Sequence, residues 1–211
     1  MDIYSELLGH FGRQNWWPAR TRFEVCVGAI LTQNTAWQNV EKAIANLKKK
    51  RLLLPLRLKK VSIDELAQLI IPSGYYNIKA RRLKEFVDFL CDRYDGDMDR
   101  MFSDRADNLR NSLLQVKGIG PETADSILLY AASIPVFVVD AYTKRIFSRL
   151  NIVDDNISYD ELQSLFMKNL PNNVTLFNEY HALIVMLGKN YCKPKPKCDG
   201  CPVKACAGPG M

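Results

Sequence analysis

Apolar residues recur at a helical spacing along almost the whole chain. In three stretches most of them fall three, four or seven positions apart, and we expect the members of each stretch to share one helix face. These positions are Ile78, Leu83, Phe86, Val87 and Leu90, then Ala124, Ile127, Leu128 and Ala131, then Leu176, Leu183, Ile184 and Leu187. The one strand-like run, 134–139, has no second strand to pair with, so we expect an extended connector there. The pattern predicts an all-α protein of nine or ten helices.

Length and composition indicate a globular protein with an anionic partner. The 211 residues are 47% hydrophobic and 25% charged, which excludes wholesale disorder and the fibrous classes. The 29 Lys and Arg against 23 Asp and Glu give a net charge of +6, which favours nucleic acid as the partner. No apolar run approaches the roughly 18 residues of a membrane span, and the acidic start is unlike a signal peptide. We therefore expect a cytoplasmic monomer without a membrane partner, nucleoid-associated if the source is bacterial or archaeal.

Four cysteines crowd into the last twenty residues, with five, two and four residues between them. They are Cys192, Cys198, Cys201 and Cys206. In a reducing compartment such crowding indicates a metal centre rather than disulfides. Four thiolates from one short loop can hold either tetrahedral zinc or a [4Fe-4S] cluster. Ordinary zinc sites prefer two CxxC pairs on a longer arm, so we expect the cluster and keep zinc as the alternative.

The segment 114–124 has the pattern of a helix-hairpin-helix. A helix is expected to end at Val116 or Lys117, two glycines permit a tight turn, and Pro121 stands where a first helical residue is favoured. Exposed N–H groups and the positive helix terminus can hold a DNA phosphate without reading a base. The alternative is an αα-hairpin that merely turns. The residues expected to contact DNA here are Lys117, Gly118, Ile119, Gly120 and Thr123.

Asp140 directly precedes an amphipathic run, 141–147. Helix capping alone would explain an aspartate at this position. Capping also lowers the pKa of a carboxylate, and an ionised carboxylate about twenty residues beyond the hairpin can stabilise positive charge on a sugar. We therefore predict that Asp140 is catalytic, with capping as the alternative.

The order of these features resembles the endonuclease III superfamily of base-excision DNA glycosylases. The shared order is the hairpin, Val-Asp before a helix, and the four-cysteine loop, and segments 74–80 and 181–192 resemble family segments as well. The resemblance implies two all-α lobes with the active site in the groove between them. One is a six-helix barrel with the helix-hairpin-helix, residues 23–133, and the other a cluster lobe from residues 1–22 and 134–211. The implied partner is double-stranded DNA with a damaged base.

This chain departs from the family pattern at two places. Bifunctional members carry a lysine two positions after the second glycine, whereas this chain has Glu122. A carboxylate cannot form an imine, so the departure implies a glycosylase without lyase activity. An acid in a first helical turn is also favoured by the helix dipole. The cysteine loop is slightly shorter than the family's usual six, two and five.

Three tryptophans refine the resemblance. Trp16 and Trp17 precede Pro18, and Trp37 follows Leu-Thr-Gln-Asn-Thr at 31–35. As ordinary core residues they would need no functional explanation. Together with the Glu-Thr-Ala-Asp of the hairpin, however, they resemble the 3-methyladenine DNA glycosylase III branch. That branch implies a base pocket of Trp16, Trp17, Trp37 and Glu122, in which a cationic alkylated purine gains attraction from electron-rich rings.

The sequence thus predicts a monofunctional glycosylase that flips an alkylated purine, chiefly 3-methyladenine, and hydrolyses its N-glycosidic bond. Asp140 would stabilise the oxocarbenium-like sugar, and Gln33 or Asn34 would fill the hole left in the duplex. One alternative is a uracil or mismatch-thymine glycosylase on the same scaffold. Another is a non-catalytic DNA-binding or redox-sensing iron-sulfur protein.

Overall fold

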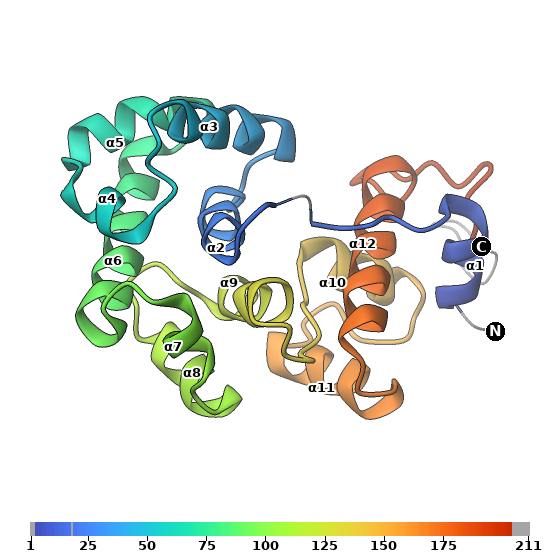
Figure 1. Ribbon diagram of the computed structural model, residues 1–211. Helices are drawn as coiled ribbons and strands as arrows, with labels where there is room; N and C mark the ends of the chain where they lie inside the picture. Colours follow the sequence, from blue (N-terminus) through green and yellow to red (C-terminus); the bar gives the residue numbers. More distant parts are fainter. Residues whose placement is uncertain (1–2, 18, 204–211) are drawn as a thin grey trace. The chain divides into compact units, whose positions relative to one another are not determined.

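The described part of the chain is entirely helical. The structure, a computed structural model, describes residues 3–17 and 19–203, which form twelve α-helices, a short 3-10 helix and a π-helical segment (Figure 1). The all-α prediction is confirmed, but nine or ten helices was too few. Helices of five or six residues, such as Pro55–Lys60 and Met98–Phe102, are too short to produce a recognisable apolar period. No helix within these residues combines the length and hydropathy that a membrane crossing requires.

The chain divides into two compact units. The first, here called the hairpin unit, is residues 19–134, and the second, the terminal unit, joins residues 1–18 to 135–211. The hairpin unit contains α2 (Arg22–Leu31), α3 (Trp37–Lys49), α4 (Pro55–Lys60), α5 (Ile63–Leu69), η1 (Ile71–Ser73), α6 (Tyr76–Tyr94), α7 (Met98–Phe102), α8 (Ala106–Leu114), α9 (Pro121–Ser126) and η2 (Ile127–Ala131). The terminal unit contains α1 (Ile3–Phe11), α10 (Ala141–Arg149), α11 (Tyr159–Asn169) and α12 (Val174–Asn190).

Helix α2 forms the centre of the hairpin unit. Every residue from Phe23 to Leu31 is buried, and the helix contacts α3, α6 and η2. Helix α6 buries the predicted face of Leu83, Phe86, Val87 and Leu90, but Ile78, which the same pattern assigned to that face, is 49% exposed. Ile78 stands five positions before Leu83 and so lies off that face, whereas Lys79 and Ala80, four and three positions before Leu83, are buried.

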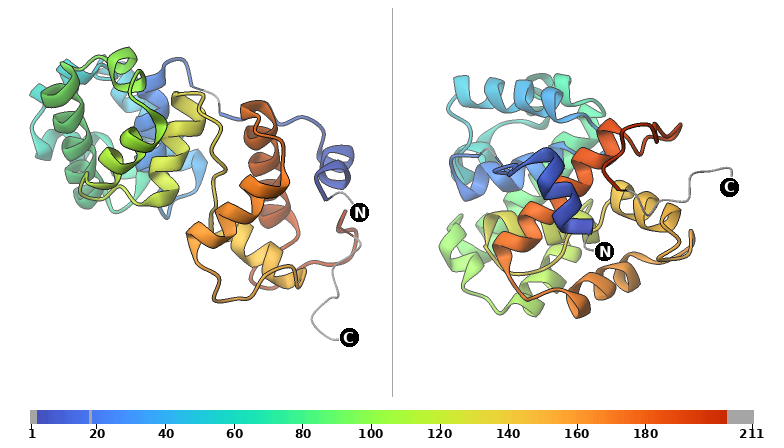
Figure 2. Two further views of the ribbon diagram at one scale, coloured as in Figure 1. Left: turned by 90° about the horizontal axis from the view of Figure 1, so that it is seen from below. Right: turned by 90° about the vertical axis from the view of Figure 1, so that its right-hand side faces the viewer.

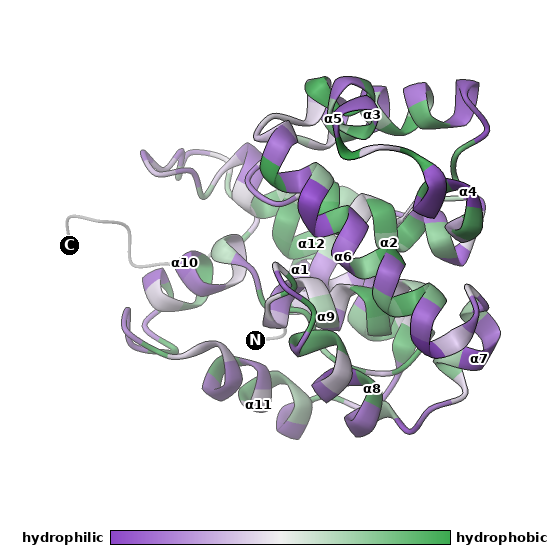
Figure 3. Cartoon of the chain, turned by 90° about the vertical axis from the view of Figure 1, so that its left-hand side faces the viewer, coloured by the Kyte–Doolittle hydropathy of each residue, from purple (hydrophilic) through white to green (hydrophobic). Residues whose placement is uncertain are grey.

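The terminal unit is built around α12. Helix α1 packs against α12, as does α10, so the N-terminal helix joins an element made from the other end of the chain (Figure 2). Helices α2 and α12 both carry mostly hydrophobic side chains, in keeping with their buried positions (Figure 3). Phe137 stacks on Phe166 with 3.9 Å between ring centroids and meets Phe177 edge-on.

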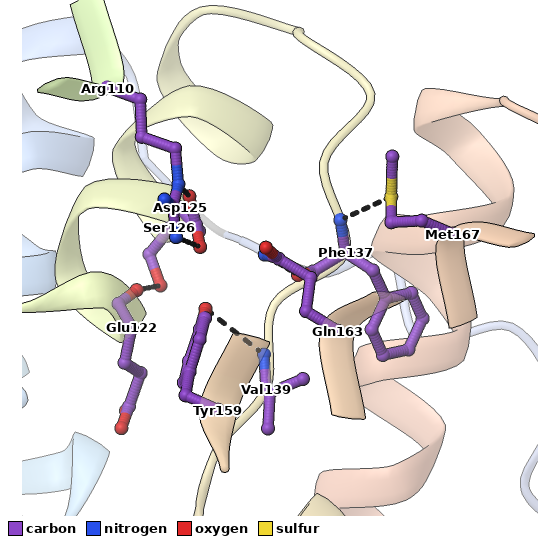
Figure 4. A network of polar contacts seen from close by, with 9 residues as sticks. All are labelled: Arg110, Glu122, Asp125, Ser126, Phe137, Val139, Tyr159, Gln163 and Met167. Carbon is purple, nitrogen blue, oxygen red and sulfur yellow. Dashed lines mark hydrogen bonds and ion pairs between the residues drawn. The ribbon is translucent and has the colours of Figure 1, made fainter. Parts of the chain in front are cut away.

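The run 134–139 is an extended connector, as predicted, and is not part of a strand. Side chains of α11 satisfy its backbone in place of a sheet partner (Figure 4). Gln163 Nε2 donates to the Phe137 carbonyl at 2.7 Å, and the N–H of Val139 approaches the Tyr159 hydroxyl at 3.5 Å. The connector leads directly to Asp140 and therefore fixes where α10 begins.

Candidate active site

The hairpin is shaped by backbone geometry at its two glycines. Helix α8 ends at Leu114, two or three residues earlier than expected, because the next N–H groups bond three residues back and tighten the last turn. Gly118 has φ +92°, and a Cβ there would lie 2.3 Å from Cγ of Arg82. Glycine is therefore required by conformation and by space.

Pro121 is the first residue of α9, as predicted. The side chain of Ile119 is buried, so only its backbone can meet a ligand, whereas Lys117 and Gly120 are exposed. Among the described residues, the N–H groups of Gly118 and Gly120 meet no hydrogen-bond acceptor. The turn thus presents free backbone donors next to a basic side chain, the arrangement that suits an anion such as phosphate.

A buried ion pair joins the two helices of the hairpin. Arg110 on α8 donates through Nε to Oδ1 of Asp125 at 2.7 Å and through Nη2 to Oδ2 at 3.0 Å (Figure 4). Asp125 on α9 is fully buried, and the planar guanidinium matches both carboxylate oxygens. Glu122, one turn earlier, is exposed, and its side chain points away from this pair.

Gln33 is tied to the hairpin. Its Nε2 donates to the Gly118 carbonyl at 3.1 Å and to the Thr123 hydroxyl at 2.9 Å, while Arg82 donates to its Oε1. The structure therefore brings three of the predicted DNA-contacting residues together within the hairpin unit. Asn34, the next residue, is exposed and has a left-handed backbone, φ +53°.

Two aromatic residues of the hairpin unit lie near the loop that carries Gln33 and Asn34. One follows this loop directly in the sequence, and the other follows a segment that the loop contacts. Trp37 is the first residue of α3 and is partly exposed. Tyr75 is 68% exposed and also has a left-handed backbone, φ +45°, just before α6. Sequence reasoning included Tyr75 only in the family-like segment 74–80 and gave it no role, because neither its exposure nor its left-handed backbone is visible in the residue pattern.

Asp140 caps α10, as the sequence predicts. Its Oδ1 accepts from the N–H of Thr143 at 2.7 Å and from the Thr143 hydroxyl at 2.8 Å. Nε2 of His181, on α12, lies 3.7 Å from its other oxygen, Oδ2. The side chains of Asp140 and His181 are only 11% and 8% exposed.

These contacts determine the charge of the carboxylate. Burial by itself raises the pKa of Asp140, but the contact with His181 and its positive charge, together with the two bonds from Thr143, more than offset that effect. The pKa of Asp140 is therefore lowered from its ordinary value, and the group is ionised at neutral pH. Capping and a persistent negative charge are thus both present at this residue.

Helices α10 and α12 approach very closely beside Asp140. A Cβ at Gly188 would lie 2.3 Å from Cδ1 of Tyr142, so the glycine makes room for that ring. Gly188 thereby keeps the N-terminus of α10 next to the part of α12 that carries His181 and Lys189.

Trp16 already faces a cation. Nζ of Lys189 lies 5.5 Å from the Trp16 ring centroid, within the range of a cation–π contact. Burial lowers the pKa of Lys189, although the charge of Asp140 acts in the opposite direction. The Trp16 indole N–H is buried and has no hydrogen-bond partner among the described residues. Trp17 is partly exposed.

The cysteine loop is anchored to the C-terminal end of α10. Arg149 Nη1 approaches Sγ of Cys192 at 3.3 Å and donates to the Lys193 carbonyl at 2.6 Å, while Arg145 Nε donates to the Cys192 carbonyl at 2.8 Å. Cys192 and Cys201 are partly exposed, and Cys198 is exposed. Cys206 lies outside the described residues, and those described form no complete metal-ligating group.

The fold and the hairpin define a helix-hairpin-helix protein of DNA repair. The family model for the HhH-GPD superfamily of base excision DNA repair proteins matches residues 27–172. A Methanocaldococcus jannaschii protein that bears the provisional name DNA repair glycosylase is 52% identical over 204 residues, covering 96% of this chain and 92% of the relative. The chain belongs to the HhH-GPD superfamily and is a DNA glycosylase of base excision repair.

Two solved structures show the same fold with recognisable sequence similarity. H. pylori 3-methyladenine DNA glycosylase bound to 1,N6-ethenoadenine has a TM-score of 0.73 at 29% identity, covering 88% of this chain and 92% of that one. A trapped covalent endonuclease III–DNA intermediate has a TM-score of 0.81 at 26% identity, covering 94% and 89%.

Proposed function

We propose that this chain is a monofunctional DNA glycosylase that flips an alkylated purine, such as 3-methyladenine, out of duplex DNA and hydrolyses its N-glycosidic bond. The observation that carries the proposal is the buried Asp140, kept ionised by His181 and Thr143, in a chain with Glu122 at the family's lysine position. A carboxylate at position 122 cannot form a Schiff base with the sugar. Strand cleavage is therefore left to a separate activity.

Asp140 acts on the sugar. As the glycosidic bond breaks, positive charge develops at C1′ and the ring oxygen, and a fixed carboxylate stabilises that charge without having to reorganise. The same carboxylate orients the attacking water. An N-methylated purine already carries a positive charge and is a good leaving group, so no strong general acid is required.

The hairpin holds the DNA backbone. The N–H groups around Gly118 and Gly120, with Lys117 and the first turn of α9, bind one phosphate, and Ile119 and Thr123 fix the turn that presents them. Gln33 or Asn34 fills the space left in the duplex by the flipped nucleotide. Tyr75, exposed beside the same loop, adds a ring on which a neighbouring base can stack.

Aromatic side chains of Trp16, Trp17 and Trp37, with Glu122, recognise the extruded base. Stacking on an indole is favourable for any base, and a cationic base gains an additional cation–π attraction. The H. pylori relative, whose structure contains 1,N6-ethenoadenine, supports an alkylated adenine as the substrate class.

In the architecture we propose, residues 23–133 form a six-helix barrel, and residues 1–22 with 134–211 form a lobe that holds a [4Fe-4S] cluster. Cys192, Cys198, Cys201 and Cys206 would be its ligands. The donor set fits, because it is all sulfur and the Arg149 guanidinium lies beside the Cys192 sulfur, where it stabilises a thiolate. The cluster supplies a structural clamp on the loop, and no step of the reaction passes through it.

The Lys189–Trp16 contact favours a second candidate. An ammonium already on the indole face repels a second cation, which suits a neutral base such as uracil or mismatched thymine.

A base-release panel separates the two candidates. Duplexes containing 3-methyladenine, 1,N6-ethenoadenine, hypoxanthine, uracil or mismatched thymine are incubated with the full chain, and the freed base is identified. We expect the methylpurine to be released fastest. Faster release of uracil or thymine would replace the alkylpurine function with the pyrimidine one.

The catalytic role of Asp140 is tested in the same assay with Asp140→Asn. Asparagine also caps helices, so a residue that only caps would leave turnover intact. Loss of the charge should instead lower base release by about 100-fold or more, equivalent to roughly 3 kcal/mol of transition-state stabilisation. Binding to undamaged duplex should survive, because the hairpin makes those contacts.

A further inference from the structure

Lys79 is a fully buried lysine whose ammonium is completely hydrogen-bonded. The residue is 1% exposed. Its Nζ donates to the Leu31 carbonyl at 2.8 Å, to the Thr35 hydroxyl at 2.6 Å and to the Ser73 carbonyl at 2.6 Å. An ammonium has three donors, so each one has an acceptor.

The three acceptors belong to three different segments. Leu31 is the last residue of α2, Thr35 lies in the loop 32–36, and Ser73 ends η1. The Thr35 hydroxyl also donates to the Ser73 carbonyl, which joins the loop and η1 a second time. A single side chain of α6 therefore fastens three separate pieces of backbone to one another.

Burying this charge has an energetic cost. Burial, followed by the nearby charge of Arg82, lowers the pKa of Lys79 to about 8, so the group is still mostly protonated at neutral pH. A buried charge is tolerated where its hydrogen bonds are complete, and removing it leaves polar acceptors without partners. The three hydrogen bonds of Lys79 therefore keep these three segments ordered relative to one another.

The loop 32–36 carries Gln33 and Asn34. Lys79 contacts this loop at Thr35, and the loop contacts the hairpin through Gln33. Gln33 Nε2 donates to the Gly118 carbonyl and to the Thr123 hydroxyl. The Asn34 backbone is left-handed, a conformation that asparagine adopts readily. Lys79 holds the loop through Thr35, the residue that follows Asn34.

We propose that Lys79 is a positioning residue for DNA engagement: its buried ammonium holds the loop 32–36 so that Gln33 and Asn34 keep their place beside the hairpin. This inference rests on the proposed function, in which those two residues fill the space left by the flipped nucleotide. Lys79 itself touches no DNA.

Lys84, on the same helix, provides a matched control. Its Nζ also contacts three oxygens, the carbonyls of Leu58, Lys59 and Val61. Those residues form the end of α4 and its exit, and none of them is a candidate site residue. Lys79→Met and Lys84→Met therefore each remove one ammonium that fastens backbone to α6. Only Lys79 contacts the loop that carries the candidate DNA-binding residues.

The experiment compares binding of the full chain to two duplexes of the same sequence. One is undamaged, and the other contains a tetrahydrofuran abasic analogue, which presents the gap without any base. We expect Lys79→Met to weaken binding to the abasic duplex by about tenfold or more and binding to the undamaged duplex by less than about twofold. Lys84→Met should change both affinities by less than about twofold. A 2-aminopurine opposite the abasic site should show reduced fluorescence change only with Lys79→Met.

The outcomes are separable. If wild type does not prefer the abasic duplex, the gap-filling part of the proposed function is overturned, and this inference with it. Suppose that the wild type prefers the abasic duplex. The inference alone is then overturned if Lys79→Met and Lys84→Met lose affinity for that duplex equally, or if Lys79→Met loses affinity for both duplexes alike. Should Lys79→Met fail to fold, Thr35→Val decides, since it removes the hydroxyl and keeps both carbonyl partners of Lys79. A selective loss of about threefold or more supports the inference, and no selective loss overturns it.

Discussion

The imidazole of His181 faces the carboxylate of Asp140 in the terminal unit, with 3.7 Å between Nε2 and Oδ2. The two residues come from different helices, and the pair is nearly inaccessible to solvent. The contact with His181 and the two hydrogen bonds from Thr143 lower the pKa of the buried Asp140 carboxylate, which therefore stays in the ionised state that stabilises a cationic sugar.

Replacing His181 by Gln should shift the acid limb of the pH–rate profile upward. The pKa of Asp140 is lowered from its ordinary value, so its charge is present above that pKa and is lost as pH falls through it. Without His181, burial is opposed by Thr143 and the charge of Lys189 but no longer by the histidine, so the pKa rises, and activity should fall at a higher pH while the neutral-pH rate changes less. The measurement is single-turnover base release across the pH range.

The control for this prediction is His10→Gln. His10 is the other histidine of the chain, and its Nε2 lies 3.1 Å from the Tyr191 hydroxyl. A shift of equal size in both variants would assign the effect to overall stability rather than to Asp140.

No covalent enzyme–DNA adduct should form in the presence of borohydride, because position 122 has a carboxylate in place of an amine. Product DNA should stay unbroken until alkali or a separate lyase acts. Efficient trapping would contradict this, and repeating the assay with Lys117→Met and Lys189→Met would then identify the nucleophile.

Lys189→Met should change which base is preferred. The variant removes the ammonium that lies 5.5 Å from the Trp16 ring centroid, so a cationic base no longer meets a like charge there. We expect the ratio of 3-methyladenine to hypoxanthine release to rise by about threefold or more, from a cation–π contact of roughly 0.5–1 kcal/mol. An unchanged or lower ratio would mean that Trp16 does not face the extruded base.

The purified protein should be brown, with absorbance at about 400 nm from thiolate-to-iron charge transfer. Metal analysis that found zinc and no iron would move the cysteine loop to a structural zinc site. Arg149→Met should lower the iron content per chain, because Arg149 holds the loop through Cys192 and Lys193. Arg100→Met, which removes an exposed arginine of the hairpin unit, should leave the iron content unchanged.

Features set by local rules could be predicted from the sequence. Asp140 as a cap and Pro121 as a first helical residue depend on neighbours within a few positions. The buried face of α6 follows from spacing alone, and the prediction fails only at Ile78, which stands five positions before Leu83 and therefore lies off that face.

Features that depend on how helices meet could not be predicted. His181 was visible only as part of a family-like segment, and nothing in the sequence placed it against Asp140. Gln33 and Gly118 are 85 positions apart, and Lys79 contacts Leu31 across 48 positions. Such pairs are determined by tertiary packing, for which a single sequence carries no periodic signal.

The close approach of α10 and α12 limits which residues a protein of this fold can carry at the contact between the two helices. With Tyr142 pressed against the backbone at Gly188, even an added methyl group would have to turn the ring or separate the helices. Separation would draw Asp140 away from His181, so the cost would appear in chemistry as well as in packing. A larger residue at position 188 therefore requires a smaller side chain at position 142, so we expect substitutions at these two positions to occur together.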